Sequence, residues 1–241
     1  MRQQFEVDTS PTKHVVVNSL TRDASVEACI FDLIDNSIDA SRDTIFSGSP
    51  DEQHFLPESY DGYEIILELS GSHFQISDNC GGIEVDRLAN MVLRFGETSS
   101  HELGIGVFGV GLNRALFKLG ARSTLTTDTG KECARVVLDV EAYLAAPDWK
   151  IPAERLPVTG KSGTVVLIEG LPSPISRDFA DRDWVASIIE EISVRYARFI
   201  EKKLRIIVNG DEIAARVAHI RDNSPFPGDY KVFQAPNSVA V

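Results

Sequence analysis

The chain has 241 residues and a net charge of −12, which excludes a chain-wide basic surface for nucleic acid and leaves only a local basic patch or a DNA-binding region outside this chain. Hydrophobic residues make up 43% and charged residues 25%, as in ordinary globular proteins. No apolar run reaches the roughly 18 residues of a membrane span, and the first residues lack the apolar core of a signal peptide. The 3 cysteines are scattered without metal-ligand spacing, so reduced thiols in a cytoplasm are expected.

Apolar spacing and turn residues divide the chain into helices, strands and loops. Apolar side chains spaced by three and four residues predict helices, β-branched or alternating runs predict strands, and clusters of Gly, Pro, Ser and Asp predict loops. In chain order, the predicted elements are a strand at 14–17, a helix at 24–46, a loop at 47–62, strands at 63–69 and 73–77, a helix at 84–95, a glycine-rich loop at 96–111, a helix at 112–119, strands at 123–127, 134–140 and 164–169, a helix at 182–201, and a hairpin at 204–208 and 212–215. Thr21 or Asp23 is expected to cap the first helix.

The order of these elements indicates the fold class. Helices and strands mix without strict βαβ alternation, and no internal repeat is evident. We therefore expect an α+β fold built as a layered sandwich, rather than a doubly wound parallel sheet. Residues 223–241 show no core pattern and are expected to begin a further domain.

The first predicted helix carries a polar stripe within the sequence FDLIDNSIDA. Asp32, Asn36 and Asp39 are spaced by four and three residues, which places them near one face of a helix. Ile34 and Ile38 lie beside them, so this face is expected to be half-buried, and buried carboxylates need a cation or a hydrogen-bond donor. Taken alone, the stretch is explained equally well as a solvated stripe of surface acids.

Two glycine-rich stretches follow. ISDNCGGI ends a predicted strand with Asp78, which can accept a hydrogen bond from an amino group such as that of a purine, and its glycines permit close approach of a ligand. GIGVFGVGL leads into a helix whose free backbone N–H groups suit phosphate. Its spacing is not that of a P-loop, and it follows a loop rather than a strand, which makes a Rossmann site a weak interpretation. Taken singly, a tight turn and a flexible loop without a ligand explain both stretches.

Taken in order, these stretches resemble the GHKL ATPase superfamily, which includes DNA gyrase, the large heat-shock chaperones, MutL and MORC proteins, and histidine kinases. The resemblance covers roughly residues 24–170, and DLIDNSIDA differs at one position from ELIDNSxDA, the usual helix motif of the MORC, MutL and chaperone branch. It implies the Bergerat ATP-binding fold, a two-layer α/β sandwich with a mixed sheet covered on one face by helices. It also implies an ATP-binding domain at 1–202 and the start of a transducer-like segment or C-terminal extension at 203–241.

The resemblance implies roles for the polar face of the first helix. Asp32 matches the general base for the water that attacks the γ-phosphate; the branch usually has Glu there, and the shorter Asp predicts slow hydrolysis. Asn36 matches the amide that binds Mg²⁺ and bridges it to the phosphates. Asp39 and Ala40 match residues that pack against the nucleotide, whereas Asp35 occupies a variable position and is expected at the surface.

The resemblance also implies an adenine pocket around Asp78, which matches the aspartate that accepts from the exocyclic amino group of adenine. Cys80 replaces the first glycine of the family pattern DxGxG and is expected to be a small hydrophobe near the purine. Thr164 matches the threonine that supports adenine through Asp78 and a water. The other implied nucleotide contacts are Gly82, Ile83, Thr98, Ser99, Gly106, Val107, Phe108, Gly109, Val110 and Gly111.

From this resemblance we expect a Mg²⁺-dependent ATPase of low turnover that works as a conformational switch, with an ATP-dependent homodimer. The alternatives are a non-hydrolysing ATP-binding regulatory module and a histidine-kinase-like catalytic domain, although no histidine lies in a helical dimerisation pattern. In this branch a second domain supplies a basic residue to the γ-phosphate. We match no residue of this chain to it, so we expect either that the chain is a fragment of a longer protein or that a partner protein supplies the charge; a downstream effector is the other expected partner. Direct nucleic-acid contact stays open, no membrane contact is expected, and the expected location is the cytoplasm, or the nucleus in a eukaryote.

Overall fold

Side chains along β1 and β2 mostly alternate between buried and less buried positions, so each strand turns one apolar face towards the helices. The computed structural model describes residues 6–47, 56–95 and 111–217. Within these residues one 8-stranded sheet forms. Its strands are β1 (Glu64–Leu69), β2 (His73–Asp78), β3 (Arg122–Asp128), β4 (Cys133–Asp139), β5 (Ala153–Leu156), β6 (Gly163–Glu169), β7 (Arg205–Val208) and β8 (Asp211–Glu212).

The strand order in the sheet is β5-β4-β3-β6-β2-β1-β7-β8. The β1–β7 pair is parallel, and the other recorded pairs are antiparallel, which makes the sheet mixed. Strand β6 lies between β2 and β3, and its register places Thr164 directly opposite Asp78. Topology alone therefore brings together two residues that are far apart in the sequence. At one edge, β8 is a two-residue strand with both residues exposed.

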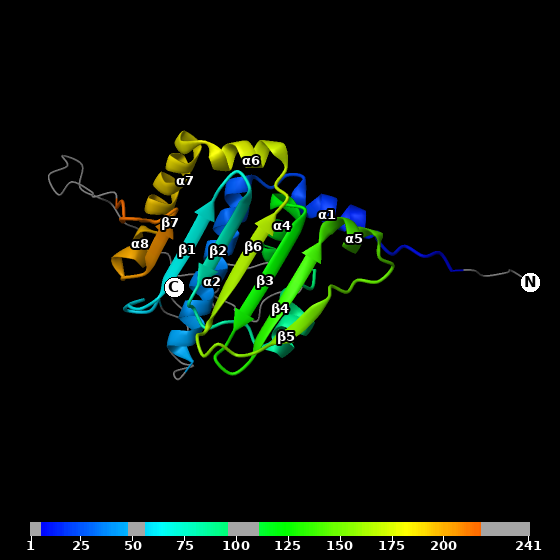
Figure 1. The fold of residues 1–241 in the computed structure, drawn as a ribbon, viewed down its shortest axis with the longest axis horizontal. Helices are drawn as coiled ribbons and strands as arrows, with labels where there is room; N and C mark the ends of the chain where they lie inside the picture. The colour runs from blue at the N-terminus through cyan, green and yellow to red at the C-terminus, as the bar shows by residue number, and fades with distance from the viewer. Residues whose placement is uncertain (1–5, 48–55, 96–110, 218–241) are drawn as a thin grey trace, which may run out of the picture.

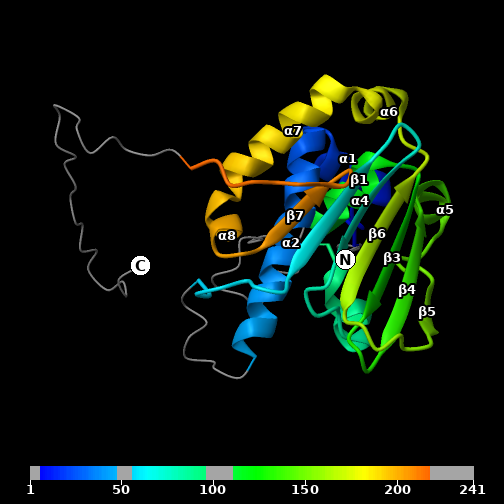
Figure 2. The same ribbon diagram turned by 60° about the vertical axis from the view of Figure 1, so that its left-hand side comes forward.

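Helices cover one face of this sheet, as Figures 1 and 2 show from two directions. They are α1 (Lys13–Thr21), α2 (Val26–Phe46), α3 (Val85–Arg87), a π-helical turn η2 (Leu88–Val92), α4 (Gly111–Leu119), α5 (Val140–Ala145), α6 (Ser173–Ala180), α7 (Arg182–Arg195) and α8 (Ala197–Glu201). Helix α2 crosses the sheet, and α4 packs against α2. The arrangement confirms the expected two-layer α+β sandwich. None of the helices in the described part of the chain has the length and apolar character of a membrane span.

The apolar face of α2 forms the centre of the core. Ile30, Ile34 and Ile38 are buried against strand residues such as Ile65 and Phe74. Full burial of one such aliphatic side chain contributes about 1.5–3 kcal/mol, so this face is the main hydrophobic attachment of α2 to the sheet. The position and rotation of the helix are therefore set by its apolar residues, and its polar residues are carried along on the other side.

The strand predicted at 14–17 is wrong, because these residues lie in α1. The run Val15-Val16-Val17 favours a strand by its β-branched side chains. In the folded protein Thr12 caps a helix instead, its hydroxyl accepting from the Val15 N–H at 3.4 Å, and α1 packs on α4. Tertiary packing therefore overrides the local preference.

The predicted helices after the first also differ in detail. Residues 84–95 do not form one helix: α3 is short and continues as the π-helical turn. The helix predicted at 182–201 is interrupted at Tyr196, where φ is −103° and ψ is 13°. Ser25, rather than Thr21 or Asp23, caps α2 by accepting from the Ala28 N–H. Three elements, α5, α6 and β5, were not predicted from the sequence.

The sheet continues past residue 203, since β7 pairs with β1. Residues 205–208 are thus part of the same layer as the central strands. The described chain ends at residue 217, shortly after β8. The division of the chain at 202 and 203 stays a prediction.

A buried lysine fastens α1 to α5, which is far away in the sequence but lies close to it in the fold. The side chain of Lys13 is 6% exposed, and its ammonium donates to the carbonyl oxygens of Tyr143 at 2.6 Å and Ala146 at 2.9 Å. These carbonyls end α5 and have no partner within that helix. The ammonium also lies 4.0 Å from the centre of the Tyr143 ring. The charge therefore compensates the negative end of a short helix.

We expect Lys13→Met to lower the free energy of unfolding by about 1–3 kcal/mol, because it leaves the buried Tyr143 carbonyl and the partly buried Ala146 carbonyl without this donor. Denaturant unfolding of the two proteins measures the difference. Lys131→Met, at an exposed position, is the matched control and should change little. An unchanged midpoint for Lys13→Met would contradict the role of this contact.

Candidate functional site

The polar residues of α2 that the sequence singled out share one side of the helix. Asn36 is exposed, Asp39 and Ala40 are half-buried, and the side chain of Asp32 is 23% exposed. The buried face is filled by the apolar residues already described. The face is therefore half-buried, as its spacing beside Ile34 and Ile38 predicted, and is not a fully solvated stripe.

Asp78, at the end of β2, is held by donors from three directions. Its Oδ1 accepts from the backbone N–H groups of Cys80 at 2.9 Å and Thr164 at 3.2 Å. Its Oδ2 accepts from the hydroxyl of Ser37, on α2, at 2.7 Å. Burial raises the pKa of Asp78, and these three hydrogen bonds oppose the rise. The carboxylate is thus fixed in one orientation between the sheet and α2.

Ser37 and Thr127 belong to this site but were not selected from the sequence. Thr127, on β3, accepts from the Ile83 N–H at 2.7 Å, and its hydroxyl lies 3.2 Å from that of Thr164. Ser37 lies inside the helix motif, directly after Asn36, so the motif itself pointed to its position. Thr127 had no local signal, because only the pairing of β3 with β6 places it opposite Thr164.

The turn after Asp78 needs its two glycines. Gly81 has φ +114° and Gly82 has φ +73°, a region that other residues rarely adopt. A Cβ at Gly82 would overlap the carbonyl oxygen of Asp128, and one at Gly81 would overlap the Thr44 hydroxyl. The glycine positions of the motif are therefore required by close packing, whether or not a ligand is bound.

Cys80 lies at the start of this turn and is fully buried. Its thiol has a raised pKa, mainly because of burial and then because of the nearby Asp78 carboxylate. A thiolate is the reactive form of cysteine, so this side chain is an inert part of the core. Ile83, which follows the turn, is half-buried and packs against the core.

Asp32 faces the first turn of α4. Its Oδ2 accepts from Nε of Arg114 at 2.9 Å and also from Nη2 of the same guanidinium. A Cβ at Gly111, the first residue of α4, would lie 3.0 Å from Cβ and Cγ of Asp32. The carboxylate therefore occupies the space left by that glycine, beside the N-terminus of a helix. Arg114 was not selected from the sequence.

The expectation that Asp35 lies at the surface is wrong. Asp35 is 7% exposed, and its Oδ1 accepts from the hydroxyl of Tyr196 at 2.7 Å, while Oδ2 lies 4.0 Å from Nη2 of Arg195. Burial raises its pKa; the Tyr196 hydrogen bond and the Arg195 charge act against this. The helical period turns Asp35 away from the open face and towards α7 and α8.

The glycine-rich segment cannot be compared in the same way. The predicted contacts Thr98, Ser99, Gly106, Val107, Phe108, Gly109 and Val110 lie outside the described residues. Within residues 6–47, 56–95 and 111–217, no group of three His, Cys, Asp or Glu side chains is placed to hold a metal ion. A cation at the α2 face would therefore need ligands from a bound molecule in addition to protein oxygens.

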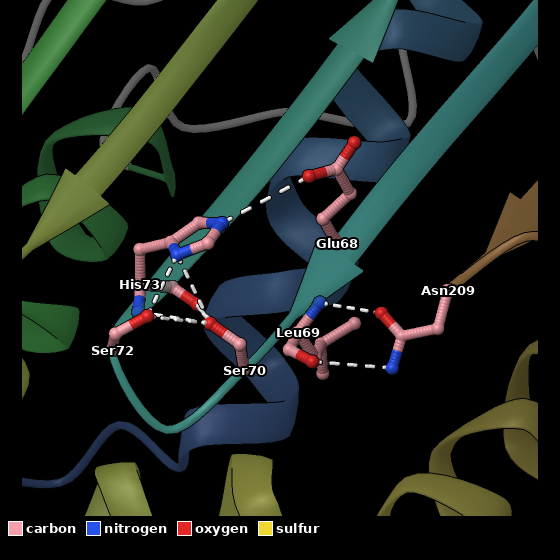
Figure 3. Close-up of polar contacts among 6 residues, drawn as sticks. All are labelled: Glu68, Leu69, Ser70, Ser72, His73 and Asn209. Atoms are coloured by element: carbon pink, nitrogen blue, oxygen red, sulfur yellow. Dashed lines mark hydrogen bonds and ion pairs between the residues drawn. The ribbon is translucent and has the colours of Figure 1, made fainter.

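A second polar cluster lies at the opposite end of β2, in the β1–β2 turn (Figure 3). His73 Nδ1 lies 3.0 Å from the hydroxyls of both Ser70 and Ser72, and its Nε2 is 3.9 Å from Glu68. Ser70 also accepts from the His73 N–H and donates to the His73 carbonyl. Both serines share one ring nitrogen and one of them closes the turn, so this serine, histidine and glutamate group stabilises the hairpin rather than activating a nucleophile. Asn209 fastens the same hairpin by hydrogen bonds to the Leu69 backbone.

Two buried carboxylates with raised pKa predict a specific pH dependence. The ordinary pKa of Asp is 3.8. Between that value and the raised native pKa, the folded protein binds more protons than the unfolded chain, so the free energy of unfolding falls as pH rises through this window. We expect Asp35→Asn to flatten that fall, because one of the two groups no longer ionises.

The measurement is denaturant unfolding of wild type and Asp35→Asn at a series of pH values from 4 upward. Asp148→Asn, at an exposed position, is the control. If wild type and Asp35→Asn showed parallel curves, the buried Asp35 carboxylate would have no such effect.

Comparison with known proteins relates the chain to a family of ATPases. The family model described as "Histidine kinase-, DNA gyrase B-, and HSP90-like ATPase" matches residues 24–162. No curated protein matches the chain. The matched region begins just before α2 and ends just before β6, so it contains the polar face of α2, the Asp78 turn and the start of α4.

Proposed function

The chain belongs to the histidine kinase-, DNA gyrase B- and HSP90-like ATPase family, and on that premise we propose that it binds ATP with Mg²⁺ and hydrolyses it slowly. The family supports the binding of a nucleotide. The geometry of Asp78 is the observation that carries the choice of adenine. The proposals of hydrolysis and of Mg²⁺ dependence are argued from Asp32 and Asn36 on the polar side of α2.

Asp78 has room for one more hydrogen bond. A carboxylate offers about four acceptor positions, and the protein fills two on Oδ1 and one on Oδ2. The remaining position on Oδ2 suits a donor such as the exocyclic amino group of adenine. Because the three protein donors fix the carboxylate, little conformational freedom is lost when that donor arrives. A 6-oxo purine would place its carbonyl oxygen, an acceptor, against the acceptor Oδ2 of Asp78 and would be rejected.

The phosphates would lie towards the N-terminus of α4. The unpaired N–H groups and the dipole of a helix N-terminus stabilise anions. Asp32 lies against the first residue of this helix, within the reach of a general base for a water near the terminal phosphate. In the proposed reaction the water oxygen bonds to the γ-phosphorus, its proton passes to Asp32, and the bond to the β,γ-bridging oxygen breaks, with its electron pair leaving on ADP.

The residues on the α2 face fit a magnesium ion held mainly by phosphate. Magnesium prefers oxygen ligands, keeps several waters and rarely has an all-protein cage. Asn36 is exposed on the same side of α2 as Asp32 and offers one carbonyl oxygen, and the described residues form no competing metal cluster. When bound, the ion would neutralise phosphate charge, while Asn36 would orient it.

The biological use of the reaction follows the MORC, MutL and chaperone branch in our proposal. Binding of ATP would favour one conformation and association of two copies, and hydrolysis would reverse it. We place this switch in the cytoplasm, or in the nucleus of a eukaryote, acting on a partner protein. One observation favours a second candidate, a non-hydrolysing ATP-binding module: Oδ2 of Asp32, the proposed base, is already engaged in an ion pair with Arg114.

Asp78 substitutions test the pocket. We expect Asp78→Ala to weaken ATP binding by about 10- to 100-fold, the effect of removing a hydrogen bond to a charged group. Asp78→Asn can present an amide donor, so it should also lose ATP but improve relative binding of inosine triphosphate, which carries an oxygen at the same purine position. Titration calorimetry gives both affinities. ATP binding equal to wild type in both variants would contradict the adenine assignment.

Asp32 and Asn36 substitutions test the chemistry. Asp32→Ala should reduce phosphate release by about 10²- to 10⁴-fold without weakening ATP binding, because a general base acts in the transition state. Asn36→Ala should raise the Mg²⁺ concentration needed for half-maximal turnover. Phosphate release is measured against Mg²⁺ concentration.

The same assay separates the two candidates. Asp32→Glu restores the longer side chain that is usual in the branch and should raise turnover if reach limits the rate. Glu141→Gln, at an exposed position, is the control and should match wild type. Tight ATP binding without turnover in wild type and in Asp32→Glu would favour the non-hydrolysing module.

A further inference from the structure

The pair formed by Asp32 and Arg114 connects two helices at the proposed phosphate end of the site. Both polar contacts of the guanidinium go to one oxygen, Oδ2, and leave Oδ1 outside the pair. The side chains are 23% and 28% exposed, so water reaches both. The pair is thus neither sealed in the core nor a free surface contact. It can separate without exposing an unpaired charge to an apolar interior.

The local packing brings the two groups together. Gly111 has no side chain, which lets α4 approach α2 closely enough for Asp32 to touch its first turn. Arg114 follows three residues later and so lies almost one helical turn further along α4. The Arg114 guanidinium therefore binds the same carboxylate, Asp32, that we propose as the general base.

We propose that Arg114 exchanges partners: it binds Asp32 in the absence of ATP and turns to the γ-phosphate when ATP is bound, which frees Asp32 for the water. This inference rests on the proposed function. In the reacting geometry the general base, the attacking water and the γ-phosphorus lie in line, so the base is only about two hydrogen-bond lengths from the phosphorus. A guanidinium bound to the base therefore lies about that close to the γ-phosphate. ADP has no γ-phosphate, so with ADP the pair stays closed.

The exchange is favourable on chemical grounds. A terminal phosphate carries more negative charge than a carboxylate and presents several oxygens, and the planar guanidinium binds two of them at once. Freed from the pair, Asp32 keeps its carboxylate next to Gly111 with both oxygens available. The helix that approaches the phosphates would then also supply the cation that the resemblance led us to expect from a second domain or a partner.

The proposal makes ATP affinity depend on Arg114 in a way that ADP affinity does not. We expect Arg114→Ala to weaken ATP binding by about tenfold or more and ADP binding by less than about twofold. Arg114→Lys should retain part of the preference for ATP, since an ammonium supplies charge without a bidentate contact. If Arg114→Ala does not fold, the ATP-to-ADP affinity ratio of Arg114→Lys provides the test. Lys118→Ala removes a cation from the same helix, one whose ammonium donates to the Thr21 carbonyl, and should leave the ATP-to-ADP ratio unchanged.

A double-mutant cycle with Asp32→Asn separates exchange from simple repulsion. Under the exchange, Asp32→Asn releases Arg114 and tightens ATP binding in the wild-type background, but has little effect when Arg114 is already alanine. If Asp32 only repelled phosphate, Asp32→Asn would tighten ATP binding equally in both backgrounds, and the proposal would be overturned.

Calorimetric titration of the full chain with ATP and ADP gives every affinity needed. An ATP-specific loss in Arg114→Ala together with a non-additive cycle supports the exchange. An equal loss of ATP and ADP in Arg114→Ala overturns the exchange and leaves the proposed function standing. Absence of binding of both nucleotides to wild type would remove the proposed function, and the exchange with it.

Discussion

The Asp78 carboxylate joins the sheet to α2, and the geometry of the site depends on this junction. A partly buried carboxylate is stable only when donors surround it. One donor comes from the turn after β2, one from the β6 backbone and one from Ser37 of α2. Strand register delivers the second and helix packing delivers the third. A shift of either layer would leave the charge without its partners, so the same interaction that orients Asp78 also penalises misalignment of the layers.

Helix α2 carries out two tasks on different sides. Its isoleucines hold it on the sheet, and its polar residues are divided between two helical neighbours: Arg114 of α4 holds Asp32, and Tyr196 at the α7–α8 junction holds Asp35. The two acids are three residues apart and face different helices. Movement of either neighbour is therefore felt by α2. A ligand that draws Arg114 away from Asp32 would change the forces on a helix whose other side is fixed to the C-terminal helices.

Much of the fold and of the site could be predicted from local pattern. The long apolar period of α2, the β1–β2 hairpin and the Asp-Gly-Gly turn all have signals within a few residues, and the structure has each of them. The errors have a common cause. The Val15–Val17 run became helical because α1 packs on α4, and the helix after residue 182 breaks where Tyr196 turns its hydroxyl to Asp35. Arg114 and Thr127 had no signal either, because only contacts between distant segments give them their places.

The two edges of the sheet limit how copies of the chain can associate. At one edge β8 has only Asp211 and Glu212, and Arg205 on β7 pairs with Glu212 across it. At the other edge β5 is four residues long and carries Glu154 and Arg155, both engaged with side chains of β4 or its preceding turn. Short, charged edges are poor templates for a further strand. Within residues 6–47, 56–95 and 111–217, both edges of the sheet are therefore poorly suited to edge-to-edge pairing with a second copy.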